Sequence, residues 1–195
     1  MPMQFGEVKK FILSKLKKEL PKYLSYHSVE HVKDVYNSAK EIAKSEGVSG
    51  DDLKLILTAA LFHDSGFLKG QSQHEKQSCV IARKHLPDYG YTSAQIKAIC
   101  GMIMATKIPQ SPTNQLEEIM CDADLDYLGR DDFYTIGNKL FSELSVYGII
   151  RTVDEWNKLQ VRFLESHNYF TKTSIKLRKA QKEKHLKKIK KLTGK

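Results

Sequence analysis

The sequence predicts an all-α fold: a single-domain bundle of many helices, with a basic helical extension at its C-terminal end. Two observations lead to this prediction. Apolar residues recur at spacings of three and four along most of the chain, which is the period of a helix with one buried face. Long runs that alternate apolar and polar residues, as a half-buried strand requires, are lacking. Helices joined by short loops pack as a bundle.

Five helices are predicted in the first part of the chain, each bounded by a proline, a glycine or a capping residue. The first helix stops near Pro21 and carries one apolar stripe, made by Val8, Phe11, Ile12 and Leu16. The next four cover about residues 28–46, 51–64, 73–85 and 92–105. Either Asp51 or Asp52 is expected to cap the third, and Gly66 closes it.

Four more helices are predicted after a loop with two prolines at residues 106–114. The sixth covers residues 115–128, and Asp131 opens a seventh that reaches Leu144. The eighth spans residues 153–167, and the ninth is the lysine-rich segment 172–195.

The positive charge is concentrated at the C-terminal end. The 195 residues include 32 Lys and Arg against 23 Asp and Glu, a net charge of +9. Residues 172–195 hold 11 of the basic residues and one acid, which leaves a net charge of −1 on residues 1–171. We therefore expect a helical domain at residues 1–171, with its motif core at about 26–144, and a solvated basic tail at 172–195. Nucleic acid is an expected partner only through this tail.

Cysteine usage and hydropathy indicate a cytoplasmic protein without membrane contact. The three cysteines, Cys79, Cys100 and Cys121, are isolated, which suits a reducing compartment. No apolar run approaches the roughly 20 residues of a membrane span, and the polar N-terminal stretch lacks a signal-peptide core. Three histidines stand apart from other reactive residues and are expected to face solvent: His85, His167 and His185.

The stretch LFHDSG, residues 61–66, ends an apolar helix with a histidine and an aspartate. A carboxylate at a helix C-terminus lies where the backbone dipole is already negative, which costs about 0.3–1 kcal/mol. His63 and Asp64 follow Ala60 by three and four residues, so both continue the buried face. A metal cation in front of the last turn would compensate the charge and accept both side chains as ligands.

Two other helices offer ligands for the same cation. In YHSVEHV, His31 leads into the apolar face of the second helix. In CDADLD, Asp124 lies closer to the apolar stripe than Asp122 or Asp126 when residues are stepped by about 100°. Two imidazoles and two carboxylates suit Mn, Fe, Co, Ni or Zn, with Mg less favoured because of the histidines. On a six-coordinate ion, four such ligands leave two positions for water and substrate.

The order of these residues resembles the HD-domain metal-dependent phosphohydrolases. The matching stretches are YHSVEHV, AALFHDSG, HEKQS and DADLDYLG, within residues 26–144. The resemblance implies an all-α fold and hydrolysis of phosphomonoesters, phosphodiesters or nucleotides. It also implies four metal ligands, namely His31, His63, Asp64 and Asp124.

The segment SGFLKG, which follows the HD pair, departs from two branches of this family. It lacks the Glu-Asp pair of the alarmone hydrolases, and Phe67 stands where the cyclic-dinucleotide phosphodiesterases have a lysine. Those two substrates are therefore disfavoured. Lys69, two residues further on, is a candidate substrate-binding residue in place of that lysine.

Three further residues complete the predicted site. The region of QHEKQS faces the metal pocket in related proteins, so His74 is a candidate catalytic residue and Glu75 a candidate substrate-binding residue. The alternative for both is an ordinary exposed helix start. Lys107, before the proline loop, is a candidate catalytic residue that neutralises phosphate, and the alternative is a lysine that simply complements a helix C-terminus.

The predicted function is metal-dependent hydrolysis of a phosphate ester in a nucleotide or a similar small molecule. A metal-bound water, deprotonated with help from Asp64, would attack phosphorus, while His74, Lys69 or Lys107 stabilises the phosphoryl oxygens or protonates the leaving group. Two alternatives stay open. One is a di-iron oxygenase, for which His74 is the available extra ligand. The other is a non-catalytic regulatory module that binds nucleotide or nucleic acid. An oligomer is compatible with the sequence.

Overall fold

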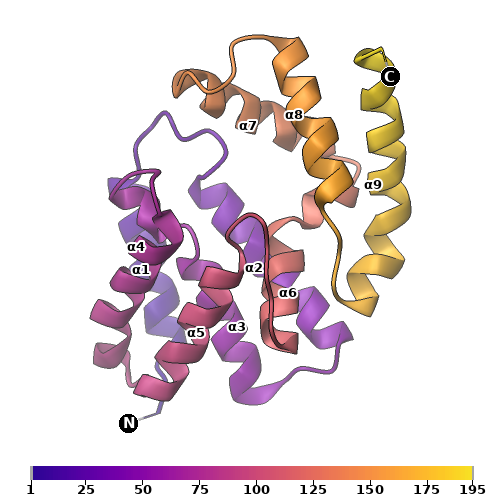
Figure 1. Ribbon diagram of the computed structural model, residues 1–195. Helices are drawn as coiled ribbons and strands as arrows, with labels where there is room; N and C mark the ends of the chain where they lie inside the picture. The colour runs from indigo at the N-terminus through magenta and orange to yellow at the C-terminus, as the bar shows by residue number, and fades with distance from the viewer. Residues whose placement is uncertain (1, 195) are drawn as a thin grey trace.

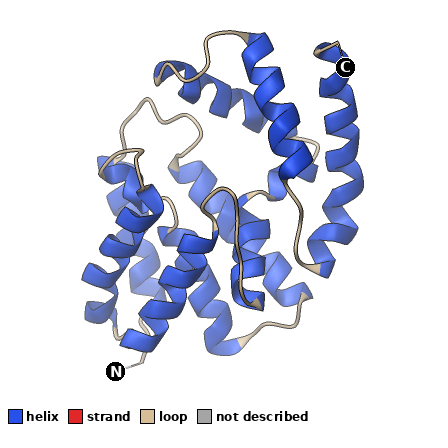
Figure 2. Ribbon diagram, in the orientation of Figure 1, coloured by secondary structure: helices blue, strands red, loops and turns tan. Residues whose placement is uncertain are grey.

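The structure, a computed structural model, describes residues 2–194, and every regular element in this range is helical. Figure 2 shows helices joined by loops, with no strand among these residues, so the predicted all-α fold is confirmed. The α-helices are α1 Phe5–Glu19, α2 Val29–Ser45, α3 Gly50–Phe62, α4 His74–His85, α5 Ser93–Ala105, α6 Gln115–Asp124, α7 Phe133–Val146, α8 Val153–Ser166 and α9 Lys172–Leu192. Short 3-10 helices are η1 Ser65–Leu68, η2 Leu86–Tyr89 and η3 Asp126–Gly129.

Two predicted helices have different ends in the structure. α3 begins at Gly50 behind Ser49 instead of behind an aspartate cap, and Asp51 and Asp52 lie in its first turn, where they complement the helix dipole. The sixth helix was expected to reach residue 128, but α6 ends at Asp124 and the chain tightens into η3. This tighter winding carries the Asp126 carboxylate to Arg178 on α9, with Nε 2.7 Å from Oδ1.

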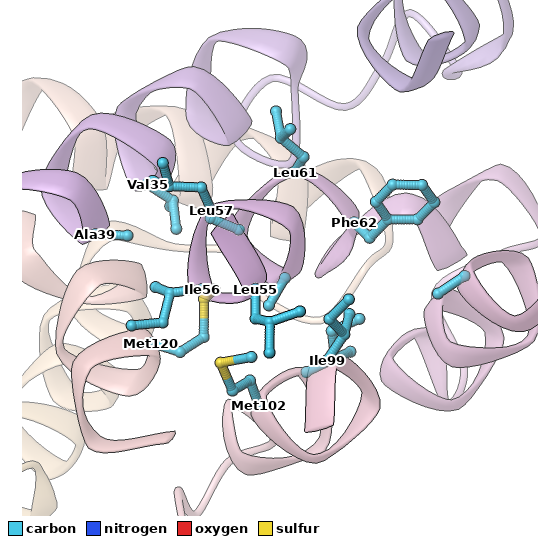
Figure 3. Close-up of a cluster of buried hydrophobic side chains, with 14 of the residues drawn as sticks. Val35, Ala39, Leu55, Ile56, Leu57, Leu61, Phe62, Ile99, Met102 and Met120 are labelled. Atoms are coloured by element: carbon cyan, nitrogen blue, oxygen red, sulfur yellow. The ribbon is translucent and has the colours of Figure 1, made fainter. Parts of the chain in front are cut away.

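The central element of the bundle is α3, in which all eight residues 55–62 are buried. It packs against α1, α2, α5 and α6. Figure 3 shows Ile56 and Leu57 of α3 surrounded by side chains of these neighbours, among them Met102 and Met120. A helix that is apolar on every side must be enclosed by other elements. The C-terminal end of α3, with the residues that follow it, therefore lies inside the protein.

The last three α-helices form a second layer across one end of the bundle. Figure 1 shows α7 and α8 above the other helices and α9 running alongside α8. Their apolar side chains share a core with η3, formed by residues such as Tyr127, Phe133, Leu164 and Ile189. The segment predicted as a basic tail is thus helical from Lys172 to Leu192 and has one buried face. No helix within residues 2–194 is both long and apolar enough to cross a bilayer.

Two aspartates of the CDADLD stretch anchor the start of α9. Asp122 is fully buried and accepts hydrogen bonds from the backbone N–H groups of Phe170 and Thr171, at 2.9 and 2.8 Å. The hydroxyl of Thr171 donates to the same carboxylate at 2.7 Å, and its oxygen caps α9 by accepting from the N–H of Ser174. The Asp122 carboxylate therefore binds the start of α9, and the Asp126 carboxylate pairs with Arg178.

The expectation that His167 and His185 face solvent is wrong. His167 is covered by α9, and His185 lies on the inner face of α9, where its ring stacks on Phe133. They are only 7% and 6% exposed. The carbonyl of His167 accepts a hydrogen bond from the buried ammonium of Lys182, and the Nε2 of His185 donates to the carbonyl of Arg130 at 2.9 Å. This buried face could not be predicted from a lysine-rich segment, which looks solvated along its whole length. Lysines can cover apolar surface with their aliphatic stems while their charged ends reach water.

We predict that His167 makes stability depend on pH. Burial and the positive charge of Lys182 lower the pKa of His167 from 6.5 to about 3. The unfolded chain therefore takes up a proton between these values while the folded chain does not, so the free energy of unfolding falls as pH decreases from 6.5. The limiting slope is about 1.4 kcal/mol per pH unit.

Urea unfolding of the parent protein and of His167→Gln, measured between pH 4.5 and 7, tests this. The slope of unfolding free energy against pH should be smaller in His167→Gln, by the contribution of about one proton. Asn168→Ala, at the exposed neighbouring position, should keep the parent slope. Equal slopes for the parent protein and His167→Gln would contradict the assignment.

Candidate metal centre

His31 is placed by the first turn of α2. Ser28 is the N-cap, and its hydroxyl accepts a hydrogen bond from the N–H of His31 at 3.4 Å. The imidazole of His31 packs against the ring of Tyr26, with centroids 4.6 Å apart. Local capping and one aromatic contact thus direct this side chain inward, and the residue is 8% exposed.

His63 and Asp64 lie just beyond the end of α3, in the turn that leads to η1. The Nδ1 of His63 donates to the carbonyl of Ala60 at 2.9 Å, and because a carbonyl can only accept, Nδ1 carries the proton. The Nε2 atom is then directed to the centre of the site, as in a metal-binding histidine. Both residues are buried.

The turn after α3 is fixed by Ser78 of α4. Its hydroxyl donates to the carbonyl of His63 at 2.6 Å and accepts from the N–H of Gly66 at 2.8 Å. A Cβ atom at Gly66 would overlap the backbone carbonyl of His74. The close approach of α4 therefore requires that position 66, the glycine of LFHDSG, has no side chain.

The four side chains predicted as metal ligands lie together. The Nε2 atoms of His31 and His63 are 3.4 Å apart. The Oδ2 of Asp64 is 3.5 Å from the first nitrogen and 3.2 Å from the second, and the Oδ1 of Asp124 is 3.3 and 3.4 Å from them. His31, His63 and Asp124 form the tightest group, with one ligand atom of each within 4.8 Å of the others.

These residues fit a divalent cation in two respects. Two atoms bound at about 2.1 Å from one ion lie roughly 3.0–3.4 Å apart in octahedral or tetrahedral arrangements, close to the separations in this cluster. The Oδ2 of Asp64 is buried and has no hydrogen-bond partner, which is costly for a carboxylate unless a cation neutralises it. The mixed nitrogen and oxygen set is that of a first-row transition metal or zinc.

The electrostatics of the cluster keep its carboxylates ionised. Burial disfavours the charged form of Asp64, but the positive charge of a protonated His63, whose Nε2 is 3.2 Å from Oδ2, holds the pKa of this carboxyl below its ordinary value. Burial acts on Asp124 in the same way, and hydrogen bonds from His31 and His63 nevertheless lower its pKa to about 2. At neutral pH both carboxylates are therefore ionised, which is the form in which carboxylates bind a cation.

The remaining predicted site residues divide into two groups. His74 and Glu75, at the start of α4, line the cavity that opens onto the cluster, and the Nε2 of His74 is 3.6 Å from the Oδ1 of Asp64. The two lysines do not line this cavity. Lys69 is exposed, and Lys107 lines a separate hollow with Pro109 and Thr113.

One pair beside the cluster was not recognised as such from the sequence. Glu143 of α7 is buried and accepts hydrogen bonds from the backbone N–H groups of Tyr26 and His27, and it also contacts the Nδ1 of His27. The His27 ring stacks on Phe67 and lines the same cavity. Residues 27 and 143 are 116 positions apart, so no local pattern could have paired them.

Comparisons with known proteins agree with this fold. The family model of the HD domain matches residues 28–127. A predicted HD superfamily hydrolase from an uncultured Thermotogales bacterium is 19% identical, with a TM-score of 0.64 over 95% of this chain and 91% of that one. A Lactobacillus plantarum protein is 18% identical, with a TM-score of 0.67 over 98% of each chain. At these identities the two structures show the fold alone. No curated protein matches the chain.

We predict that Gly66→Ala destabilises the protein and disturbs the cluster. The added methyl group meets backbone atoms of His74, which cannot move aside as a flexible side chain can. The expected loss is roughly 2–3 kcal/mol of unfolding free energy, measured by chemical denaturation. Gly6→Ala in α1 is the control, because its Cβ has nothing within 4 Å, and it should be neutral or stabilising. Equal stabilities of the two variants would contradict this account.

We predict opposite effects for two neighbouring aspartates of α6. Asp124→Asn removes a charge from the cluster and should weaken the binding of Mn²⁺ or Zn²⁺, measured by calorimetry, by more than the roughly 100-fold typical of an outer-shell partner. Asp122→Asn should bind the metal normally but lose about 1.5–3 kcal/mol of stability, because its charged hydrogen bonds to residues 170 and 171 weaken. If Asp122→Asn lost the metal and Asp124→Asn kept it, the assignment of the metal to Asp124 would be wrong.

Proposed function

The chain belongs to the HD domain family, and from this premise we propose that it is a metal-dependent phosphohydrolase that cleaves a phosphate ester of a small molecule. The supporting observation is the cluster itself. Two imidazole nitrogens and two carboxylate oxygens, supplied by α2, the end of α3 and the end of α6, face one another with separations of 3.2–3.5 Å between each nitrogen and its neighbours. Three of the four side chains also border a cavity large enough for a ligand.

The proposed division of roles follows the positions of the side chains. His31, His63, Asp64 and Asp124 hold a divalent cation, which as a Lewis acid neutralises phosphoryl charge and lowers the pKa of water. Asp64 has one oxygen toward the histidines and the other toward His74. This second oxygen can accept a proton from an attacking water molecule or orient the imidazole of His74.

His74 is the proposed proton donor to the leaving group. It is the first residue of α4, it is partly exposed at the cavity wall, and Asp64 and Glu75 each lie 3.6 Å from its Nε2. Its Nε2 therefore lies between two carboxylates at the cavity wall, within reach of a leaving-group oxygen to which it can donate a proton. His27, whose Nδ1 is held by Glu143, lies on the same wall and can hydrogen-bond a phosphoryl oxygen.

Phosphate recognition through Lys69 or Lys107 is not part of the proposed mechanism. Neither lysine lines the cavity, so the helix-end alternative accounts for Lys107 and an exposed loop position accounts for Lys69. Charge neutralisation then falls to the cation and to the histidines of the wall.

Metal analysis and a substrate screen test the proposal. The purified protein is assayed with Mn²⁺, Co²⁺, Ni²⁺ or Mg²⁺ against 4-nitrophenyl phosphate, its diester and mononucleotides. We expect metal-dependent turnover that His63→Ala abolishes together with the bound metal. His85→Gln, at the opposite end of α4 from His74 and outside the cavity lining, should keep both.

Two results would contradict the proposal. If His63→Ala kept full phosphatase activity and its metal, the cluster could not be the catalytic metal site. Two tightly bound iron ions per chain, with oxygen consumption instead of phosphate release, would support the di-iron oxygenase alternative.

A further inference from the structure

We propose that the phosphate ester cleaved at this site carries an apolar organic group, of the size of a phenyl ring or a short alkyl chain. This inference rests on the proposed function and deepens it by naming the substrate class. It differs from the nucleotide expected from the sequence. The observations that carry it are the walls, the charge and the volume of the cavity beside the cluster.

The cavity has a polar end and an apolar end. His31, Asp64 and Asp124 border one end, with His27 and His74 beside them. From there the cavity extends between α7, α8 and η3. The walls of this part are formed mainly by apolar side chains, including Leu128, Phe133, Leu140, Trp156, Phe163 and Leu164.

The far end offers very little to a polar ligand. The hydrogen-bonding groups that α8 contributes to the wall are the Gln160 amide, which already donates to Asn157 at 3.4 Å, and the indole N–H of Trp156. A nucleobase that enters an apolar space must leave its donors and acceptors without partners, which costs binding free energy. An aryl or alkyl group has no such groups to satisfy, and it gains by leaving water.

The charge of the lining also argues against a polyphosphate. Among residues 2–194, no lysine or arginine lines the cavity. Arg130, the residue that follows the DADLDYLG stretch, is held by Asp34 at 2.9 Å and by Asp132 at 2.8 Å. Sites for diphosphates and triphosphates normally supply several cationic side chains or backbone nests. One phosphoryl group facing the cluster is the charge that these walls can accommodate.

The volume limits the size of the group. The cavity measures about 220 Å³, and its polar end must also take the phosphoryl group. Only the apolar part is left for the organic group. A phenyl ring or a short alkyl chain is compact enough for such a space, whereas a nucleoside is much larger. The substrate class is therefore a phosphate ester with one compact apolar substituent.

The first test is a series of esters that differ only in apolar length. Methyl, propyl, butyl and hexyl phosphate, phenyl phosphate and deoxyadenosine monophosphate are compared as substrates of the metal-loaded protein. We expect kcat/KM to rise about threefold to fourfold for each added methylene group, the factor for burial of one CH₂. Hexyl and phenyl phosphate should exceed the nucleotide. A flat series, or a preference for the nucleotide, would overturn the inference.

Variants of the wall provide the second test. Gly137 lines the apolar end, and a Cβ atom there would meet Gln160 and Trp156 at ordinary contact distances of 3.6 and 3.7 Å. Gly137→Ala should therefore fold and should lower the ratio of kcat/KM for hexyl phosphate to that for methyl phosphate. Leu140→Ser should lower the same ratio at least tenfold. Leu177→Ser, at an exposed position of α9, is the matched control. Unchanged ratios in both wall variants would overturn the inference.

A binding measurement separates the failure of this inference from the failure of the proposed function. Hexylphosphonate and methylphosphonate, which cannot be hydrolysed, are titrated into the Mn²⁺-loaded protein by calorimetry. Tighter binding of hexylphosphonate, with no ester hydrolysed, would leave the apolar subsite standing and refute the phosphohydrolase. Hydrolysis of esters with equal affinity for the two phosphonates would refute the apolar subsite alone.

Discussion

The burial of the Asp64 carboxylate is the constraint on which the rest of the structure depends. Its Oδ2 lies inside the protein, at the negative end of α3, without a hydrogen-bond donor. Such a group is tolerated only if positive charge reaches it, and both histidines of the cluster are directed there by local hydrogen bonds. The enclosure of α3 on every side is what makes the penalty large. A cation is the ligand that would relieve this penalty.

The two layers of the protein contribute different chemistry to one cavity. The bundle around α3 supplies the charged and titratable groups, and α7 with α8 supplies a wall of leucine and aromatic side chains. Glu143 joins the layers, because this residue of α7 fixes the backbone and ring of His27 just before α2. The position of the apolar wall relative to the cluster is therefore held by a buried carboxylate as well as by packing.

Much of the fold could be predicted from local patterns, because helical periodicity, Gly66 and Pro87 are visible within a few residues of the elements that they bound. The four proposed ligands could be selected for the same reason, since each continues the inward face of the helix that carries it or ends just before it. Long-range contacts could not be predicted. Leu128 and Trp156 look like ordinary core residues in the sequence, and only the packing of α7 and α8 leaves a space between them. His167 was misjudged because its covering helix is rich in lysine.

The alternation of roles in CDADLD has a consequence for the way this protein tolerates change. Asp122 and Asp126 hold α9 by hydrogen bonds to Thr171 and Arg178, while Asp124 between them faces the cluster. Any event that detaches the lysine-rich helix, such as proteolytic trimming, a bulky modification or polyanion capture, would release two aspartates on either side of a proposed ligand. Binding at the outer surface of α9 and occupancy of the cluster would then be thermodynamically linked, each altering the other by the same factor.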